Sequence, residues 1–186
     1  MKLISIVFSF KNEEKNLTEL VTRTAKVFSD LNSHNYELIF VNDNSDDDSE
    51  ETLIKLQQDY PITIINTSRT FGRDPCILAG FEYAKGDAVV IMMADQSDSC
   101  KDVVTYWKKL NEGWDCILGS RFISGGETFE YPLVKLILNR VGNWIIMLLF
   151  RIPFNDTTNA FKAYRMSTLD VCRPFLAHHF NLTVEL

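Results

Sequence analysis

Short apolar segments alternate with amphipathic segments along most of this chain. The apolar runs are too short for helices and rich in β-branched residues, which is typical of strands buried on both faces of a sheet. We place these strands at 3–9, 36–41, 62–66, the apolar part of 87–98, and 115–119. Segments with helical periodicity separate them: one opening at 11–14, one over about 49–58, one over 76–84 and one over about 102–111. Strict alternation of strand and helix predicts an α/β fold with a mainly parallel sheet and right-handed crossovers.

The regular alternation stops after residue 126. Leu133 to Phe150 forms an amphipathic segment that includes the most apolar run of the chain. Lys135, Arg140 and Arg151 interrupt the wider region Leu133 to Phe154, and its uninterrupted apolar run is shorter than the roughly 20 residues that cross a bilayer. We therefore expect a helix that does not span a membrane. A core helix is the simpler interpretation, and a helix lying on a membrane surface or on a partner subunit is the alternative.

Composition narrows the class of protein. At 186 residues the chain is long enough for one domain with a substantial core. The net charge of -6 and the pI near 5.1 argue against nonspecific nucleic-acid binding. The cysteines are scattered without a C-x-x-C pair or a zinc-like histidine spacing, so we expect free thiols in a reducing, cytoplasmic compartment.

The strand within 87–98 ends on carboxylates. Open α/β sheets bind ligands outside the carboxyl ends of their strands, so Asp95 and Asp98 are expected at the rim of a crevice. Carboxylate oxygens suit a hard divalent cation that bridges to substrate phosphates. The competing interpretation is a polar turn in which Asp98 or Ser97 caps the next helix.

Two other loops add charged groups to the same predicted edge. Four aspartates within 42–48 exceed what the start of one helix requires, and we expect the strand ending at Asp43 to lie next to the strand ending at Asp95. The loop 69–75 holds two arginines, a glycine and a proline suited to the first turn of a helix. Arginines near a helix N-terminus are a reasonable phosphate contact. The alternative is a surface loop whose arginines are solvated. Asn12 is the expected cap of the first helix.

Six segments, taken in order, resemble the motifs of the family 2 glycosyltransferases, and in particular the branch similar to dolichyl-phosphate mannose synthases and bacterial polyprenyl-phosphate sugar transferases. The segments and the family motifs are Asn12-Glu13 for Y-N-E, Val41–Ser45 for V-D-D-G-S, Arg69 with Phe71-Gly72 for R-N-x-G, Met92–Asp98 for the D-x-D region, Gly119–Arg121 for G-S-R, and Asp156–Arg165 for D-x-T-x-x-F-R-x-Y-R. No single motif is decisive, but the ordered set covers nearly the whole chain.

The resemblance implies a GT-A fold, a Rossmann-like mainly parallel sheet flanked by helices, formed as one catalytic domain over 1–186. It implies inverting transfer of a sugar from a nucleotide diphosphate sugar to a polyprenyl (dolichyl or undecaprenyl) phosphate, with Mg or Mn as cofactor. The substrate-binding residues carried over are Ser9, Asn12, Glu13, Asp43, Ser45, Arg69, Gly72 and Ala94; the metal ligands are Asp95 and Asp98; the catalytic residues are Arg121 and Asp156. Arg121 would pair with phosphate, and Asp156 would accept a proton if the acceptor were a hydroxyl.

The same resemblance implies how the chain is placed in the cell. A lipid-phosphate acceptor implies peripheral contact with the cytoplasmic face of a membrane, and the 133–150 segment would make that contact or the contact between subunits of a homo-oligomer. Family members generally continue past the position of Leu186. The chain is therefore either a short member or one that lacks a segment helping to hold the lipid.

Departures from the family pattern keep an alternative open. Met93-Ala94-Asp95 replaces the usual Asp-Ala-Asp, Asn42 replaces an acidic residue, and Ser9-Phe10-Lys11 replaces P-x-Y. A binding or scaffold module that has lost the metal site would account for them. A nucleotidyltransferase or an NAD-dependent oxidoreductase fits less well, because the loop 10–14 is acidic and lacks glycine.

Overall fold

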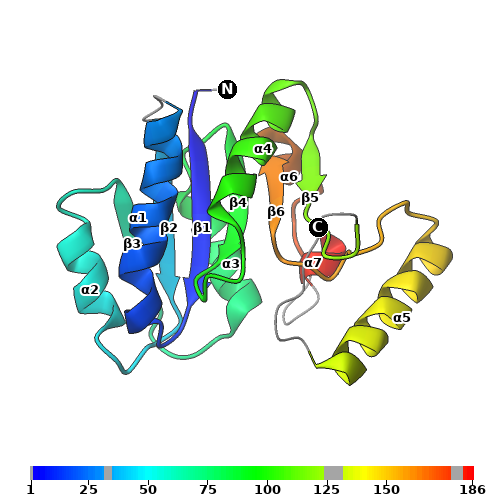
Figure 1. Cartoon of the computed structure of the whole chain (residues 1–186), viewed down its shortest axis with the longest axis horizontal. Coiled ribbons are helices and arrows are strands. Elements are labelled where there is room, and N and C mark those ends of the chain that lie inside the picture. Colours follow the sequence, from blue (N-terminus) through cyan, green and yellow to red (C-terminus); the bar gives the residue numbers. More distant parts are fainter. Residues whose placement is uncertain (1, 32–34, 124–131, 177–181) are drawn as a thin grey trace.

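The computed structural model describes residues 2–31, 35–123, 132–176 and 182–186, which form one sheet with helices on both faces (Figure 1). The strands are β1 Ile4–Phe10, β2 Tyr36–Asn42, β3 Ile62–Asn66, β4 Ala88–Met93, β5 Cys116–Leu118 and β6 Lys162–Arg165. The helices are α1 Glu14–Asp30, α2 Ser49–Leu56, α3 Arg73–Tyr83, α4 Cys100–Asn111, α5 Leu133–Phe150, α6 Met166–Cys172 and α7 Leu182–Glu185. The strand order is β3-β2-β1-β4-β6-β5, and β1 to β4 are mutually parallel. The predicted α/β class and mainly parallel sheet are confirmed.

The central strand β1 is buried along its whole length and divides the core into two layers. Successive side chains of a strand point to opposite faces. Ile4, Ile6 and Phe8 therefore pack with the apolar sides of α1, α2 and α4, whereas Val7 packs with α3, α6 and α7. On the first face Phe8 and Phe40 stack with ring centroids 4.5 Å apart. Burial on both sides explains why these strands lack an alternating polar pattern.

The far edge of the sheet differs from the prediction. β6 was not predicted as a strand, and it pairs antiparallel with both β4 and β5. β5 was expected to be buried, but it is a three-residue edge strand with intermediate exposure. β6 was missed because its sequence, Lys162-Ala163-Tyr164-Arg165, carries charges at both ends, and the first of them is buried. An apolar-run criterion does not detect such a strand.

The order of the strands corrects a second expectation. β2 and β4 are not neighbours, because β1 lies between them and pairs in parallel with both. The strand register places Phe10 beside Asn42, and Ser9 beside Met93. The carboxyl ends of β1, β2 and β4 therefore reach the same edge of the sheet, and the groups that follow them converge there.

Helix α5 is not the core helix that the sequence analysis favoured. It extends away from the sheet at the right of Figure 1, and only Asn143 among its 18 described residues is buried. Its exposed apolar residues include Leu133, Leu138, Trp144 and Leu148. By length and composition alone, α5 is the one described helix that could cross a membrane. The apolar character of this segment therefore reflects something other than packing against the sheet.

Candidate active site

A hollow lies at the carboxyl ends of β1, β2 and β4. Its lining residues are Ser9, Phe10, Lys11, Glu13, Asp43, Arg73, Met93, Ala94 and Asp95. Asp43 and Asp95 thus share one cavity although their strands are not adjacent, as the prediction of a common crevice required. Ser9, Glu13 and Ala94 also line it, as expected for residues at strand ends of an open α/β sheet.

Asp43 is buried and organises the loop that follows β3. Its carboxylate oxygens accept hydrogen bonds from the backbone N–H groups of Phe71, at 2.7 Å, and Gly72, at 2.9 Å. Gly72 has a φ of 93°, a left-handed conformation that glycine adopts without a steric penalty. The predicted Gly72 position is therefore tied directly to Asp43. The hydrogen bonds from Phe71 and Gly72 to Asp43 fix where α3 begins, and therefore also the position of Arg73, its first residue.

The turns after β1 and β2 brace each other. The Asn12 N–H donates to Ser45 Oγ at 2.9 Å, and the Asp46 N–H donates to Asn12 Oδ1 at 3.0 Å. Asn12 was expected to cap α1, but it does not. The cap position is Glu13, which makes no side-chain cap hydrogen bond. Asn12 and Ser45 thus link the two loops and are not among the residues that line the hollow.

The arginine that lines the hollow is Arg73, the first residue of α3, and not the predicted Arg69. Arg69 is exposed, and its guanidinium lies 4.8 Å from the centroid of the Phe71 ring. Arg73 lines the hollow instead, with its Nε donating to Asp74 at 2.7 Å. Asp74 is buried and also accepts the N–H of Leu182. In the sequence, Arg73 lies between a flexible glycine and a proline suited to the start of a helix. That position could have identified Arg73 as the arginine that lines the hollow.

The turn after β4 separates the two predicted metal ligands. Asp95 is exposed at the mouth of the first hollow, where its Oδ1 accepts the Ser97 N–H at 3.0 Å. Asp98 lies in a second hollow and accepts the Met93 N–H at 2.7 Å. Burial raises the pKa of the Asp98 carboxyl to about 7, although the Met93 hydrogen bond opposes this shift. Neither Ser97 nor Asp98 caps α4, whose cap position is Ser99.

Gln96 is the residue of this turn with a strained backbone. Its φ is 63°, which is uncommon for a residue other than glycine, asparagine or aspartate. Its side chain accepts a hydrogen bond from Arg23 of α1 at 2.9 Å, so the turn is held from outside the hollow. Backbone strain of this kind persists where the surroundings impose it, and it often lies at functional sites.

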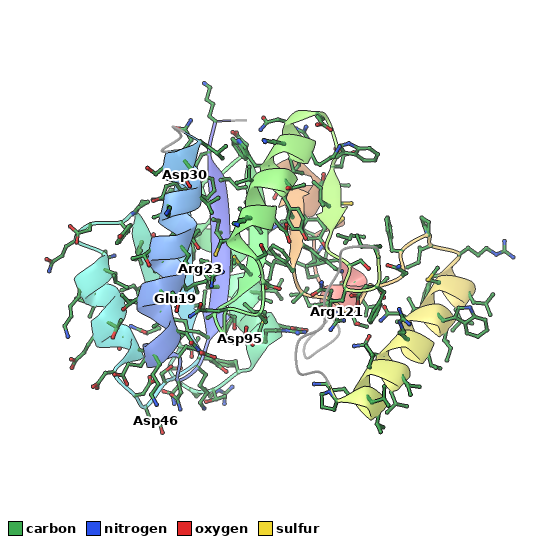
Figure 2. The ribbon with its side chains drawn as sticks, in the orientation of Figure 1. Glu19, Arg23, Asp30, Asp46, Asp95 and Arg121 are labelled. Carbon is green, nitrogen blue, oxygen red and sulfur yellow. The ribbon has the colours of Figure 1, made fainter. Side chains whose placement is uncertain are left out.

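Asp156 is buried and pairs with Arg121, which lines the second hollow together with Asp98 and Asn159. The Arg121 Nε donates to Asp156 Oδ2 at 2.8 Å, and its Nη2 donates to Oδ1 at 2.7 Å. The Arg121 backbone N–H also donates to Oδ2. The Asp156 side chain is fully buried, whereas 24% of the Arg121 side chain is exposed. Asp156 therefore holds the guanidinium in a fixed plane while part of Arg121 faces solvent. Figure 2 shows Arg121 and Asp95 at the same end of the sheet.

The glycine before Arg121 has a packing role. A Cβ at Gly119 would lie 2.4 Å from the Tyr106 hydroxyl and 2.7 Å from the Phe161 carbonyl oxygen. The Gly119 N–H donates to that same carbonyl at 3.0 Å. Any larger residue would push the segment leading to Arg121 away from β6. The glycine of the G-S-R motif is therefore required by a close backbone approach.

The residues at the first hollow fit a divalent cation that is shared with a substrate. Within the described residues, no group of three or more His, Cys, Asp or Glu side chains is arranged to hold a metal by itself. Mg and Mn ions in nucleotide sites commonly take one or two carboxylates and complete their coordination with phosphate oxygens and water. Asp95 offers an exposed carboxylate of this kind, and Arg73 adds positive charge in the same hollow.

Comparison with known proteins shows which families and folds this chain resembles. The sequence model of glycosyl transferase family 2 matches residues 5–172. The chain is 28% identical over 137 residues to the dolichol-phosphate mannosyltransferase of Pyrococcus furiosus, covering 74% of this chain and 38% of that protein. It is 28% identical over 194 residues to the undecaprenyl-phosphate 4-deoxy-4-formamido-L-arabinose transferase of Pseudomonas syringae, covering 97% of this chain and 55% of that one. The chain thus spans about half or less of these relatives.

Solved structures support the fold. Glucosyl-3-phosphoglycerate synthase from Mycobacterium tuberculosis, in complex with Mn2+, uridine diphosphate and phosphoglyceric acid, matches with a TM-score of 0.72 and 18% identity. The match covers 98% of this chain and 62% of that structure. At this identity the likeness establishes the fold alone, and it confirms the predicted GT-A architecture. Together with the match over 5–172, it shows that the chain belongs to glycosyl transferase family 2.

Proposed function

We propose that this chain is the catalytic domain of an inverting glycosyltransferase that moves a sugar from a nucleotide diphosphate sugar to a polyprenyl phosphate. The observation that carries the proposal is the shared hollow at the ends of β1, β2 and β4. There Asp43, Asp95 and Arg73 meet, and the paired Arg121 lies beyond the β4–α4 turn. Carboxylates beside arginines at one sheet edge suit a donor that carries phosphate charge and binds with a cation.

The first hollow is assigned to the donor. Asp95 would hold the Mg or Mn ion, which neutralises negative charge on the leaving diphosphate. Arg73, fixed by Asp74, pairs with the same phosphates. Asp43, Ser9 and Glu13 define the wall that accommodates the nucleoside. Asp98 is bonded to Met93 and lies in the neighbouring hollow, so we assign it to shaping the turn that presents Asp95.

The state of Asp156 favours an acceptor that arrives already ionised. In a single displacement the acceptor oxygen attacks the anomeric carbon, the bond to the diphosphate oxygen breaks, and the configuration inverts. A hydroxyl acceptor would need a base, but both Asp156 oxygens accept hydrogen bonds from Arg121 and the side chain is fully buried. A phosphate needs no base and would be attracted by the exposed part of Arg121.

A groove beside Arg121 suits a lipid attached to that phosphate. Its lining residues are Phe122, Arg140, Val141, Trp144, Met147 and Asn155, and its volume is about 380 Å³. The guanidinium groups of Arg121 and Arg140 lie 5.3 Å and 5.1 Å from the centroid of the Phe122 ring. Apolar walls with two cations near Phe122 suit an anionic isoprenoid. The exposed apolar face of α5 would then rest on the membrane that holds the lipid.

Transfer of radiolabelled sugar tests this function directly. The chain is incubated with Mn and a panel of UDP, GDP and CDP sugars, with either undecaprenyl phosphate or undecaprenol in detergent. We expect organic-phase label with one donor and the phosphate acceptor, and none with the alcohol. Transfer to the alcohol alone would overturn the phosphate assignment. If no combination of donor and acceptor gives product, the chain is a binding or scaffold module and not a glycosyltransferase.

The membrane contact is tested separately. Replacing Trp144, Ile145 and Leu148 with glutamate should reduce co-sedimentation with anionic vesicles by roughly 10-fold or more, because charged groups are costly in the apolar interface. Ile54→Glu on α2 is the control, since Ile54 is half exposed and Figure 1 shows α2 at the left, beyond the edge of the sheet opposite to α5. Unchanged sedimentation of the α5 variant would assign this face to an oligomer interface.

A further inference from the structure

Asn143 is the buried side chain that joins helix α5 to the loop 156–158, and Asn139 of the same helix adds one contact by accepting a hydrogen bond from Thr158 Oγ1 at 3.0 Å. Asn143 is 1% exposed, although most of α5 is exposed. Its Oδ1 accepts hydrogen bonds from the Thr157 N–H at 2.7 Å, the Thr157 Oγ1 at 2.8 Å and the Thr158 N–H at 3.4 Å. A buried amide with its acceptor fully used fixes both the helix and the loop it contacts. The position of α5 is therefore defined relative to residues 157–158.

The same amide is linked to the Arg121–Asp156 pair. Asn143 Nδ2 donates to Thr158 Oγ1 at 3.0 Å. The Thr158 Oγ1 lies 3.4 Å from Asp156 Oδ1 and 3.5 Å from Arg121 Nη2. The backbone next to Asp156 is thus held by Asn143, and Asp156 in turn holds Arg121. The path from α5 to the arginine runs through hydrogen bonds at each step.

We propose that Asn143 is a positioning residue: through the loop 156–158 it sets the orientation of the Arg121 guanidinium toward the acceptor. The proposal rests on the proposed glycosyl transfer for its kinetic consequence, and on the hydrogen bonds alone for its structural one. Arg121 is partly exposed, so its plane is defined by Asp156 rather than by close packing. If the loop loses its contact with Asn143, the Arg121 guanidinium can change its orientation. Misplacement of a reacting group by about 1 Å costs roughly 100-fold in rate.

A purely structural role for Asn143 predicts a different outcome. If Asn143 only attaches α5, its loss lowers stability and lipid binding, but leaves turnover at saturating acceptor unchanged. A positioning role lowers kcat at saturating acceptor and leaves the donor KM unchanged, because the donor hollow is lined by other elements. The separation of kcat from donor KM therefore distinguishes the two roles.

The kinetic experiment compares Asn143→Ala with Asn111→Ala, an exposed asparagine on α4 that is remote from the loop. We expect roughly 100-fold lower kcat for Asn143→Ala and wild-type kinetics for the control. Adding Asn143→Ala to Arg121→Lys should cause no further loss, because both changes act on one interaction. Unchanged kcat, or a fully multiplicative double variant, would overturn the proposal. If Asn143→Ala does not fold, the isosteric Thr158→Val replaces it, with the same expectations at a smaller loss.

A readout independent of activity separates this proposal from the proposed function. The Arg121 Nε–H bonded to Asp156 should give a distinct, slowly exchanging NMR signal. In Asn143→Ala or Thr158→Val we expect that signal to exchange faster and to shift toward those of exposed arginines. An unchanged signal overturns the positioning role even if the enzyme is active. A changed signal in a protein that transfers no sugar upholds it and rejects only the assigned reaction.

Discussion

The proposed donor side and the proposed acceptor side of this molecule are built by different means. The donor side consists of β1 to β4, whose buried strands bring their polar ends to one edge, with Asp43 fixed by backbone amides. On the acceptor side, Arg121 is held by Asp156, and its loop is held by Asn143 of an otherwise exposed helix. Sheet geometry thus places the first site, and side-chain hydrogen bonds place the second. Single substitutions should therefore affect the two sides differently.

The largest effect is expected at Asp95, on the donor side. Asp95→Asn removes the proposed cation ligand, so we expect kcat to fall by roughly 10³-fold, while the exposed position leaves stability unchanged. Asp30→Asn, an exposed aspartate at the end of α1, is the matched control. Steady-state transfer kinetics at varied Mn measure both. A larger loss in Asp98→Asn than in Asp95→Asn would reverse the roles assigned to these carboxylates.

On the acceptor side, Arg121→Lys should reduce kcat by roughly 100-fold and also lower the melting temperature. Lysine keeps the charge but does not reproduce the paired hydrogen bonds to Asp156, which is fully buried and would lose a partner. Kinetics and thermal unfolding are measured on one preparation. Loss of activity without loss of stability would show that Asp156 does not depend on this arginine.

The close approach at Gly119 gives a smaller effect, measured as stability. Gly119→Ala places a Cβ against Tyr106 and the Phe161 backbone, and should lower the free energy of unfolding by about 1–3 kcal/mol. Gly142→Ala on α5 is the matched control, because nothing lies within 4 Å of its added Cβ. That control should raise stability by about 0.5–1 kcal/mol through helix propensity. Equal effects in denaturant titrations would refute the packing argument.

Much of the donor side could be predicted from the sequence, because buried parallel strands leave an apolar signature and their polar ends meet at one edge. The proposed acceptor side was harder to predict from the sequence. β6 begins with Lys162, a buried charge, so its sequence resembles a polar loop. Strand order was also hidden, since nothing local in the sequence indicates that β1 separates β2 from β4. Asn143 stood within an apolar segment, where burial of its amide depends on contacts with residues distant in sequence.

The buried Lys162 gives the smallest expected effect, a pH dependence. Burial lowers the pKa of Lys162 from 10.5 to about 8, although the charge of Asp156 opposes this. Between these two values the unfolded chain binds more protons than the folded one, so this group makes stability rise with pH. The slope should be at most about 1.4 kcal/mol per pH unit.

Lys162→Met isolates that contribution, because tyrosine and cysteine side chains titrate in the same range. Chemical denaturation between pH 7.5 and 10.5 compares the two proteins. The free energy of unfolding of wild type minus that of Lys162→Met should increase across this interval. A difference that is flat or falls with pH would mean that Lys162 is charged in the folded protein throughout.

Isothermal titration calorimetry tests the central claim, that Asp43 and Asp95 belong to one cation-dependent donor site. UDP, GDP and CDP are titrated into the wild-type chain and into Asp95→Asn, each with Mn and with EDTA. We predict saturable binding of one nucleotide to the wild type in the presence of Mn, and its loss in EDTA and in Asp95→Asn. Equal binding under all these conditions, or no binding of any nucleotide, would contradict the account.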